Sequence, residues 1–168
     1  SIDAIDINVE GHDFQVLQGA SDLLDGGVVK LIKVEFELIP VYDGQGYFSD
    51  IDQYLRMKSF RLAGIQIDYA RPLAVKKVFC QGEPLWGKAL YVPTISHSFS
   101  YLKKIASTNG IDAARNQMAL IIALYASAKL PGMVFDILAI ARTLNLLTPL
   151  EAEQLRLKLI GAFKWAKL

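Results

Sequence analysis

The amino-acid sequence predicts an α/β fold followed by an all-α segment, and two observations carry this prediction. In residues 1 to 93, stretches with an apolar side chain at every second position alternate with stretches of helical apolar spacing, as in a mostly parallel α/β sheet. Residues 94 to 168 show helical spacing alone. We therefore expect two domains, a sheet domain over residues 1 to 93 and an extension of about four helices over residues 94 to 168.

The first predicted strand covers residues 2 to 9, where isoleucine and valine alternate with polar residues. Gly11 ends this strand. Residues 13 to 25 have the apolar spacing of a helix, and the pair Gly26-Gly27 provides its C-terminal stop. The chain therefore opens with a strand and a helix joined by a short turn.

The pattern then repeats. Residues 28 to 39 predict a second strand, residues 51 to 58 a helix and residues 60 to 67 a third strand. Two more strands are predicted over residues 74 to 80 and 87 to 92. Because only a short connection joins these two strands, we expect them to form an antiparallel pair. The last strand of the otherwise parallel sheet would then be antiparallel.

Turn signals divide the second half of the chain into helices. Asn109-Gly110, Pro131-Gly132 and Thr148-Pro149 separate stretches that all have helical spacing. One of these stretches is apolar nearly all round, which predicts a central position in a helical layer or a place in a contact. The predicted helices cover residues 98 to 108, 111 to 130, 132 to 146 and 149 to 166.

Composition excludes several classes of protein. Hydrophobic residues make up 52% of the chain and charged residues 21%, which is typical of a globular protein. The net charge of +1 provides no global field for nucleic acid, so no nucleic-acid partner is expected. The uncharged stretch over residues 116 to 128 is shorter than the roughly 20 residues that span a bilayer. A single cysteine, Cys80, excludes an internal disulfide and favours a reducing, cytoplasmic location.

One motif carries a family resemblance. The first strand ends in Val9-Glu10-Gly11-His12, and the next helix contains the run from Val16 to Ala20. These residues resemble the central block of FkbM-type S-adenosylmethionine-dependent methyltransferases, in which an Asp-Val-Glu-Gly-His-Glu-like run precedes a Val-Leu-x-Gly-Ala-like run. Weaker similar pieces follow in the family's order at residues 33 to 36, 54 to 64 and 88 to 92.

The resemblance implies a fold, a cofactor and an activity. It implies that residues 1 to 93 are the C-terminal, acceptor-side part of a Rossmann-like methyltransferase domain. The implied reaction is methyl transfer from S-adenosylmethionine to a hydroxyl group of a small-molecule or glycan acceptor, such as a secondary metabolite. No Gly-x-Gly-x-Gly turn occurs in these residues, so we expect the cofactor-binding half to lie upstream of Ser1.

Candidate catalytic residues follow the first two strands. Ligands of open α/β sheets bind at the carboxyl ends of the strands, and neighbouring strands lie about 4.8 Å apart. Glu10 and His12 follow the first strand, whereas Glu35 and Glu37 lie near the end of the second. His12 is the predicted proton acceptor because its ordinary pKa lies near neutrality, and Glu35 is the second choice. Glu10 is expected to position the cofactor or the acceptor.

Further candidates bind ligands. Asn8 stands where the family usually has an aspartate, and Asp6 carries an acid two residues earlier on the same strand face. Both are therefore expected near the cofactor. Tyr42, Asp43 and Tyr47, in the loop after the second strand, are expected to contact a sugar-like acceptor through ring faces and hydroxyl groups. Nothing in the sequence requires a metal ion.

Each assignment has a structural alternative. Glu10 and His12 also fit helix-start residues without a catalytic role, and the Lys33, Glu35 and Glu37 face fits a solvated strand face. The loop from Tyr42 to Tyr47 fits an ordinary turn. For the whole chain, the alternative function is a non-catalytic module whose helical segment docks a partner or forms a homo-oligomer.

Overall fold

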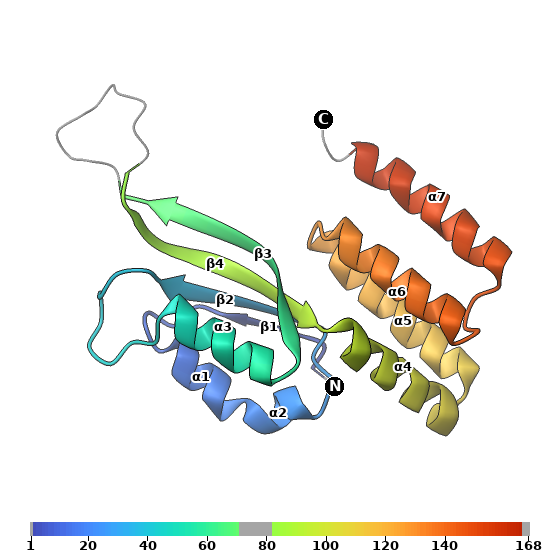
Figure 1. The fold of residues 1–168 in the computed structure, drawn as a ribbon, viewed down its shortest axis with the longest axis horizontal. Helices are drawn as coiled ribbons and strands as arrows, with labels where there is room; N and C mark the ends of the chain where they lie inside the picture. Colours follow the sequence, from blue (N-terminus) through green and yellow to red (C-terminus); the bar gives the residue numbers. More distant parts are fainter. Residues whose placement is uncertain (1, 71–81, 166–168) are drawn as a thin grey trace. The chain divides into compact units, whose positions relative to one another are not determined.

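The structure is a computed structural model that describes residues 2 to 70 and 82 to 165 (Figure 1). The strand expected over residues 74 to 80, together with Cys80, lies outside the described residues. The chain divides into two compact units, Ser1–Pro93 and Thr94–Leu168.

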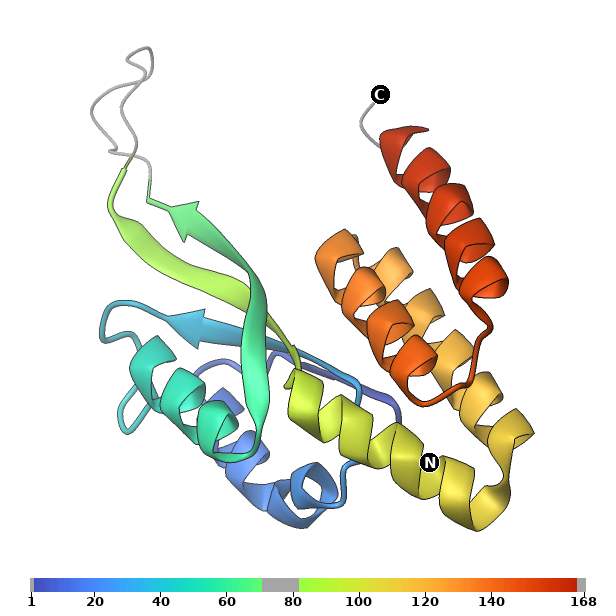
Figure 2. The same ribbon diagram turned by 45° about the vertical axis from the view of Figure 1, so that its right-hand side comes forward.

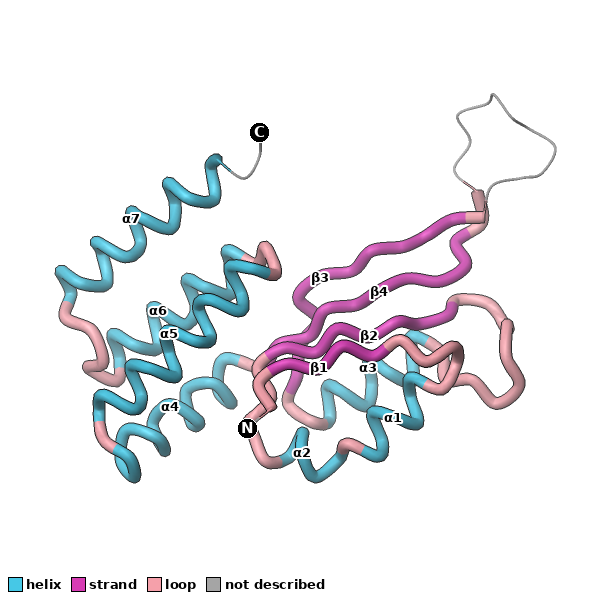
Figure 3. The backbone as a smooth tube through the Cα atoms, turned by 180° about the vertical axis from the view of Figure 1, so that it is seen from behind, coloured by secondary structure: helices cyan, strands magenta, loops and turns pink. Residues whose placement is uncertain are grey.

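The first unit contains a four-stranded mixed sheet in the order β1-β2-β4-β3 (Figure 3). The strands are β1 (Ala4–Ile7), β2 (Leu31–Glu37), β3 (Phe60–Tyr69) and β4 (Pro84–Pro93). β1 and β2 pair in parallel, whereas β4 is antiparallel to both of its neighbours. The α/β class and the antiparallel last strand are thus confirmed.

The expectation of a mostly parallel sheet is wrong, because β1 and β2 make the one parallel pairing among the described strands. β4 does not extend the sheet at its edge but lies between β2 and β3. Parallel neighbours need a crossover connection, and β1 and β2 have the helices α1 and α2 between them in the chain. β4 is antiparallel to both β2 and β3, so its place between them makes two of the three described pairings antiparallel.

Three helices cover one face of this sheet: α1 (Asp13–Gly19), α2 (Ser21–Asp25) and α3 (Phe48–Met57) (Figures 1 and 2). The single helix expected over residues 13 to 25 is divided at Ala20, whose backbone leaves the helical region at φ −88° and ψ 10°. The N–H of Ala20 lies close to two carbonyl oxygens of the preceding turn, which tightens the end of α1.

The core of the first unit lies between the sheet and these helices. Ile32, Val34 and Phe36 occupy alternate positions of β2 and are fully buried, and they join a cluster with Leu17 of α1 and Leu55 of α3. Each fully buried side chain of this size stabilises the fold by about 1.5–3 kcal/mol. Since strand side chains alternate between faces, the residues between them point to the face of the sheet opposite α1, α2 and α3.

The second unit contains α4 (Ile95–Asn109), α5 (Ile111–Ser127), α6 (Pro131–Thr143) and α7 (Pro149–Trp165). α5 packs against both α4 and α6, whereas α7 packs against α6. α7 begins with reciprocal hydrogen bonds, because the Thr148 N–H donates to the Glu151 carboxylate (2.8 Å) and the Glu151 N–H donates to Thr148 Oγ1 (3.2 Å). Among the described residues, no helix has the length and hydrophobicity needed to cross a membrane.

Candidate active site

A pocket of about 460 Å³ lies where β1 and β2 end side by side. Its walls come from the end of β2, from the segments that follow β1 and β2, and from the first half of β4. The volume falls within the range of small-molecule sites. The lining residues are Asn8, Glu10, Glu35, Glu37, Ile39, Val41, Tyr42, Leu85, Trp86 and Lys88.

The pairing of β2 with β4 places the polar side chains of this pocket. Glu35 lies opposite Lys88 in the antiparallel ladder, and Glu37 lies opposite Trp86. Directly opposed residues of neighbouring strands direct their side chains to the same face. The Lys88 ammonium also lies 5.7 Å from the centre of the Trp86 ring. Two acids, one cation and one aromatic ring are therefore fixed by backbone hydrogen bonds.

The turn after β1 holds Glu10 and Tyr42 together. Glu10 and Gly11 both have positive φ angles, 53° and 86°. The Tyr42 hydroxyl donates a hydrogen bond to Glu10 Oε2, and a Cβ atom at position 11 would overlap the Tyr42 ring. Only glycine therefore fits position 11, because it tolerates both the left-handed backbone and the close approach of the ring. The glycine of the Val-Glu-Gly motif thus allows the loop after β2 to close on the end of β1.

The loop that carries Tyr42 is braced from within. The Gln45 side chain accepts hydrogen bonds from the N–H groups of Val41 (2.8 Å) and Tyr42 (2.6 Å) and donates to the Ile39 carbonyl (2.8 Å). Gln15 of α1 donates to the Gly44 carbonyl (3.0 Å). These bonds position Tyr42 before any ligand binds, which lowers the entropic cost of binding.

The acids of the pocket lie in an unusual electrostatic setting. Glu37 is 5% exposed, and its Oε2 has no hydrogen-bond partner within the described part of the chain. Burial raises the pKa of the Glu37 carboxyl, and the nearby Asp13 carboxylate raises it further. Burial also raises the pKa of the half-buried Glu35, whereas Lys88 acts to lower it. Both groups therefore hold protons at higher pH than ordinary glutamates do.

Asp13, at the start of α1, is a buried neighbour of these acids. It is 2% exposed, its Oδ1 accepts a hydrogen bond from the Val9 N–H (3.4 Å), and its Oδ2 has no partner among the described residues. Burial raises the pKa of its carboxyl. Asp13 is outside the pocket lining, so it acts on the pocket through its charge.

The structure brings together four of the residues singled out in the sequence, Asn8, Glu10, Glu35 and Tyr42, which all line the pocket. Glu35 is only half-buried and its neighbour Glu37 is buried, so this part of β2 is not a fully solvated strand face. The parallel pairing of β1 and β2 produces this arrangement, because it places their carboxyl ends at one edge of the sheet.

The other four predicted residues lie outside the pocket lining. Asp6 forms an ion pair with Lys33 (2.8 Å) on the exposed strand face. The side chain of His12 is exposed at the residue preceding α1. Asp43 is exposed in the loop after β2, and Tyr47 precedes α3, with its N–H donating to the Asp50 carboxylate (2.8 Å). The structure therefore does not gather these four with the pocket acids.

The sequence predicted that Glu37 lies beside Glu35 at the end of the second strand, but it assigned no role to two other lining residues, Trp86 and Lys88. Trp86 and Lys88 meet these acids only through the ladder between β2 and β4, whose register spans about 50 residues of sequence. No local pattern reveals such a register.

The first part of the chain matches a known protein family. Residues 1–62 match the family model described as the Methyltransferase FkbM domain. The match confirms the family resemblance over this part of the chain, and this family implies S-adenosylmethionine as the methyl donor. The FkbM segment contains β1, β2 and the lining residues up to Tyr42, whereas Leu85, Trp86 and Lys88 lie beyond it. No curated protein and no solved structure matches the chain.

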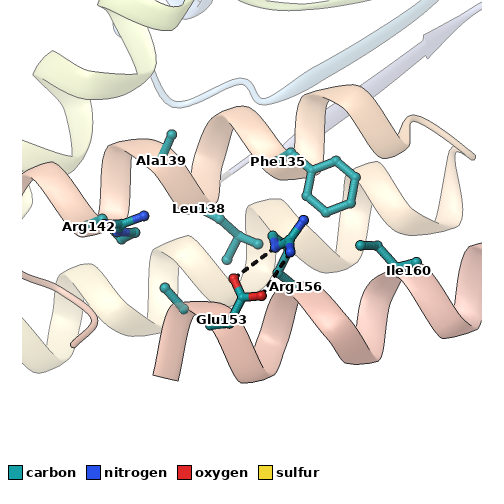
Figure 4. A pocket seen from close by; sticks show the side chains of 8 residues that line it. Phe135, Leu138, Ala139, Arg142, Glu153, Arg156 and Ile160 are labelled. Carbon is teal, nitrogen blue, oxygen red and sulfur yellow. Dashed lines mark hydrogen bonds and ion pairs between the residues drawn. The ribbon is translucent and has the colours of Figure 1, made fainter. Parts of the chain in front are cut away.

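The helical unit has a pocket of a different kind, about 330 Å³ in volume, between α6 and α7 (Figure 4). Its walls are mainly apolar, and its polar groups are two arginines and one glutamate. Arg156 and Glu153 form an ion pair at 2.8 Å, drawn with dashed lines in the figure. The lining residues are Phe135, Leu138, Ala139, Arg142, Ala152, Glu153, Arg156 and Ile160. This set provides no pair of acid and base suited to proton transfer.

Proposed function

We propose that the pocket at the ends of β1 and β2 is the acceptor side of an O-methyltransferase site. The reaction is transfer of a methyl group from S-adenosylmethionine to a hydroxyl group of a glycan or secondary metabolite. One observation carries the proposal: the strand ends within the FkbM segment deliver Asn8, Glu10 and Glu35 into one open pocket. The single cysteine of the chain is consistent with a reducing, cytoplasmic setting for the reaction.

The acids of β2 are the proposed proton acceptors. Methyl transfer to a hydroxyl group requires alignment of the acceptor oxygen and removal of its proton. Glu35 and Glu37 line the pocket, and their raised pKa values bring them closer to neutrality, where a general base is most effective. Because His12 is exposed outside the lining, we place it after these two glutamates as a proton acceptor.

The residues present account for only part of a cofactor site. S-adenosylmethionine supplies the methyl group when bound, but the chain contains no Gly-x-Gly-x-Gly turn to hold its methionine moiety. Of the two residues predicted to contact the cofactor, Asn8 reaches the pocket and Asp6 is paired with Lys33. We therefore assign to Asn8 and Glu10 the positioning of bound groups at the rim of the pocket.

The aromatic residues of the pocket are the proposed acceptor contacts. Tyr42 and Trp86 are 37% and 38% exposed, so each presents ring surface to a ligand while its remaining surface is packed. Planar rings beside carboxylates suit a sugar, whose C–H groups cover the ring while its hydroxyl groups donate to the acids. Asp43 and Tyr47 follow in the same loop and are proposed as outer contacts.

Titration calorimetry with S-adenosylmethionine on the full-length gene product tests this function, followed by a methyl-transfer assay on hydroxylated acceptors. We expect cofactor binding and, in the Glu35→Gln and Glu37→Gln variants, unchanged cofactor affinity with about a 100-fold or larger loss of transfer rate. Absence of binding at millimolar S-adenosylmethionine would remove the proposal. His12→Gln separates the candidate bases, because it lowers the rate only if His12 takes part.

The helical unit supports a second candidate function, self-association. Leu150 and Leu157 of α7 are 68% and 58% exposed, so this helix presents apolar side chains that its own unit does not cover. Light scattering after size exclusion measures the mass of the chain in solution. A dimer that dissociates in the Leu150→Glu, Leu157→Glu double variant would support this candidate, and a monomer at all concentrations would exclude it.

A further inference from the structure

The pocket at the ends of β1 and β2 is acidic. Three of its lining residues, Glu10, Glu35 and Glu37, carry carboxyl groups, and one, Lys88, carries an ammonium group. Lys88 lies opposite Glu35 in the ladder and over the ring of Trp86, so it offsets part of this charge. When its carboxyl groups are ionised, the pocket keeps an excess of negative charge.

The Glu37 carboxylate is the group in this pocket to which a cation could bind. The side chain is 5% exposed and lines the pocket, but its Oε2 makes no hydrogen bond to any described residue. A buried carboxylate without a partner costs free energy, and a bound cation would provide that partner. The negative charges of Asp13 and Glu35 disfavour ionisation of Glu37, and the same charges would strengthen the binding of a cation beside it.

The surroundings of the acids favour an organic cation over a metal ion. In the described part of the chain, no group of three or more His, Cys, Asp or Glu side chains is arranged to hold a metal ion. Apolar and aromatic side chains of Ile39, Val41, Leu85 and Trp86 stand beside the acids instead. An organic ammonium matches both features, since its charge meets the carboxylates and its carbon skeleton covers the apolar wall.

Resting on the function proposed above, we infer that the acceptor carries a protonated amino group, which binds the Glu37 carboxylate and one carboxylate oxygen of Glu35. A neighbouring hydroxyl group receives the methyl group and loses its proton to the other carboxylate oxygen of Glu35. The substrate class is therefore an amino alcohol, and an amino sugar if the acceptor is a glycan. The same acids disfavour acceptors that carry phosphate or carboxylate groups, because these would enter an acidic pocket. S-adenosylmethionine is also an organic cation, so the test must separate the two sources of positive charge.

Nuclear magnetic resonance of the labelled 168-residue chain provides this test. The indole N–H of Trp86 reports on the pocket, and a Trp165→Phe variant assigns its signal because these are the two tryptophans of the chain. The chain is titrated separately with glucosamine, N-acetylglucosamine and S-adenosylmethionine at neutral pH. We expect glucosamine to shift the Trp86 signal with a Kd about tenfold or more below that of N-acetylglucosamine, whose nitrogen is uncharged.

Variants locate the binding site. Glu37→Gln and Glu35→Gln should each weaken glucosamine binding by about tenfold, because each removes one charge that faces the amine. Asp22→Asn removes one exposed negative charge from α2, outside the pocket lining, and should leave the Kd unchanged. If Glu37→Gln does not fold, the half-buried Glu35 still provides the test, since its side chain contributes less to the core.

Three results would overturn the inference: equal affinity for the two sugars, no shift with glucosamine, or a shift with S-adenosylmethionine alone, which would assign the acids to the cofactor. Proton release on glucosamine binding, measured by calorimetry in buffers of different ionisation enthalpy, provides independent support. These measurements need no methyl transfer. Failure of the methyltransferase proposal with retained glucosamine preference would therefore be distinguishable from failure of the amine inference.

Discussion

The pocket beside β1 and β2 differs from the pocket between α6 and α7 in how its side chains are held. The acids of the first pocket stand on strands whose backbones are paired, and Tyr42 is fixed by the braced loop. The second pocket depends on one helix pair and on a surface ion pair between Glu153 and Arg156. Chemistry requires side chains held within about 0.5 Å, which the first arrangement provides better.

The same difference extends to the packing of the two units. Leu55 of α3 is fully buried, whereas Leu157 of α7 is 58% exposed. α1, α2 and α3 form part of a layered core against the sheet, while α7 packs against α6. The pocket acids thus stand on a sheet with a layered core, whereas α7 leaves apolar side chains exposed.

The largest expected effect comes from the core. Leu55→Ala should lower the free energy of unfolding by about 2–5 kcal/mol, because it leaves a cavity beneath the sheet. Leu157→Ala should change it by about 0.5 kcal/mol or less, since the side chain is mostly exposed. Urea denaturation followed by circular dichroism measures both variants. Equal losses would show that α7 is packed as tightly as α3.

A smaller effect is expected at Gly11. Gly11→Ala should destabilise the fold by about 1–3 kcal/mol, because alanine is strained at positive φ and its methyl group would displace the Tyr42 ring. Gly161→Ala in α7 is the matched control, as no atom lies within 4 Å of the added methyl group. Alanine there should stabilise the helix by about 0.5–1 kcal/mol. A harmless Gly11→Ala variant would contradict the close packing of Tyr42.

The smallest effect is a difference in pH dependence. The folded-state pKa of Glu37 is raised, so the folded protein holds this proton more tightly than the unfolded chain does. Its contribution to stability is therefore present below the unfolded pKa and is lost as pH rises through the folded pKa. In the Glu37→Gln variant, the free energy of unfolding should no longer show this decrease as pH rises. Denaturation curves between about pH 4 and pH 8 measure the difference between the two proteins.

Glu153 of the helical unit should behave in the opposite sense. Arg156 lowers the pKa of its carboxyl through a hydrogen bond, so its contribution is present above the unfolded pKa and is lost as pH falls through the folded pKa. Because Glu153 is exposed, the effect should be slight. If Glu37→Gln and Glu153→Gln changed the pH dependence of stability in the same direction, the opposite pKa shifts of these two glutamates would be contradicted.

Local pattern was sufficient to predict much of the first unit. Alternation identified β1 and β2, and their parallel pairing placed Glu10 and Glu35 in one pocket as expected. Local pattern failed where a contact joins distant segments. It did not reveal that β4 lies between β2 and β3 or that Tyr42 binds Glu10.

Local sequence is enough to predict the strand and helix periodicity, the Val-Glu-Gly-His motif and the change to an all-helical pattern near Pro93, because these depend on residues close together in the chain. Two features follow from the folded structure instead. Glu37 is buried with no hydrogen-bond partner for its Oε2 among the described residues, and Trp86 and Lys88 lie beside it. Burial and cross-strand register arise from contacts between segments far apart in the chain, and the free energy of such contacts appears only when the sheet has formed.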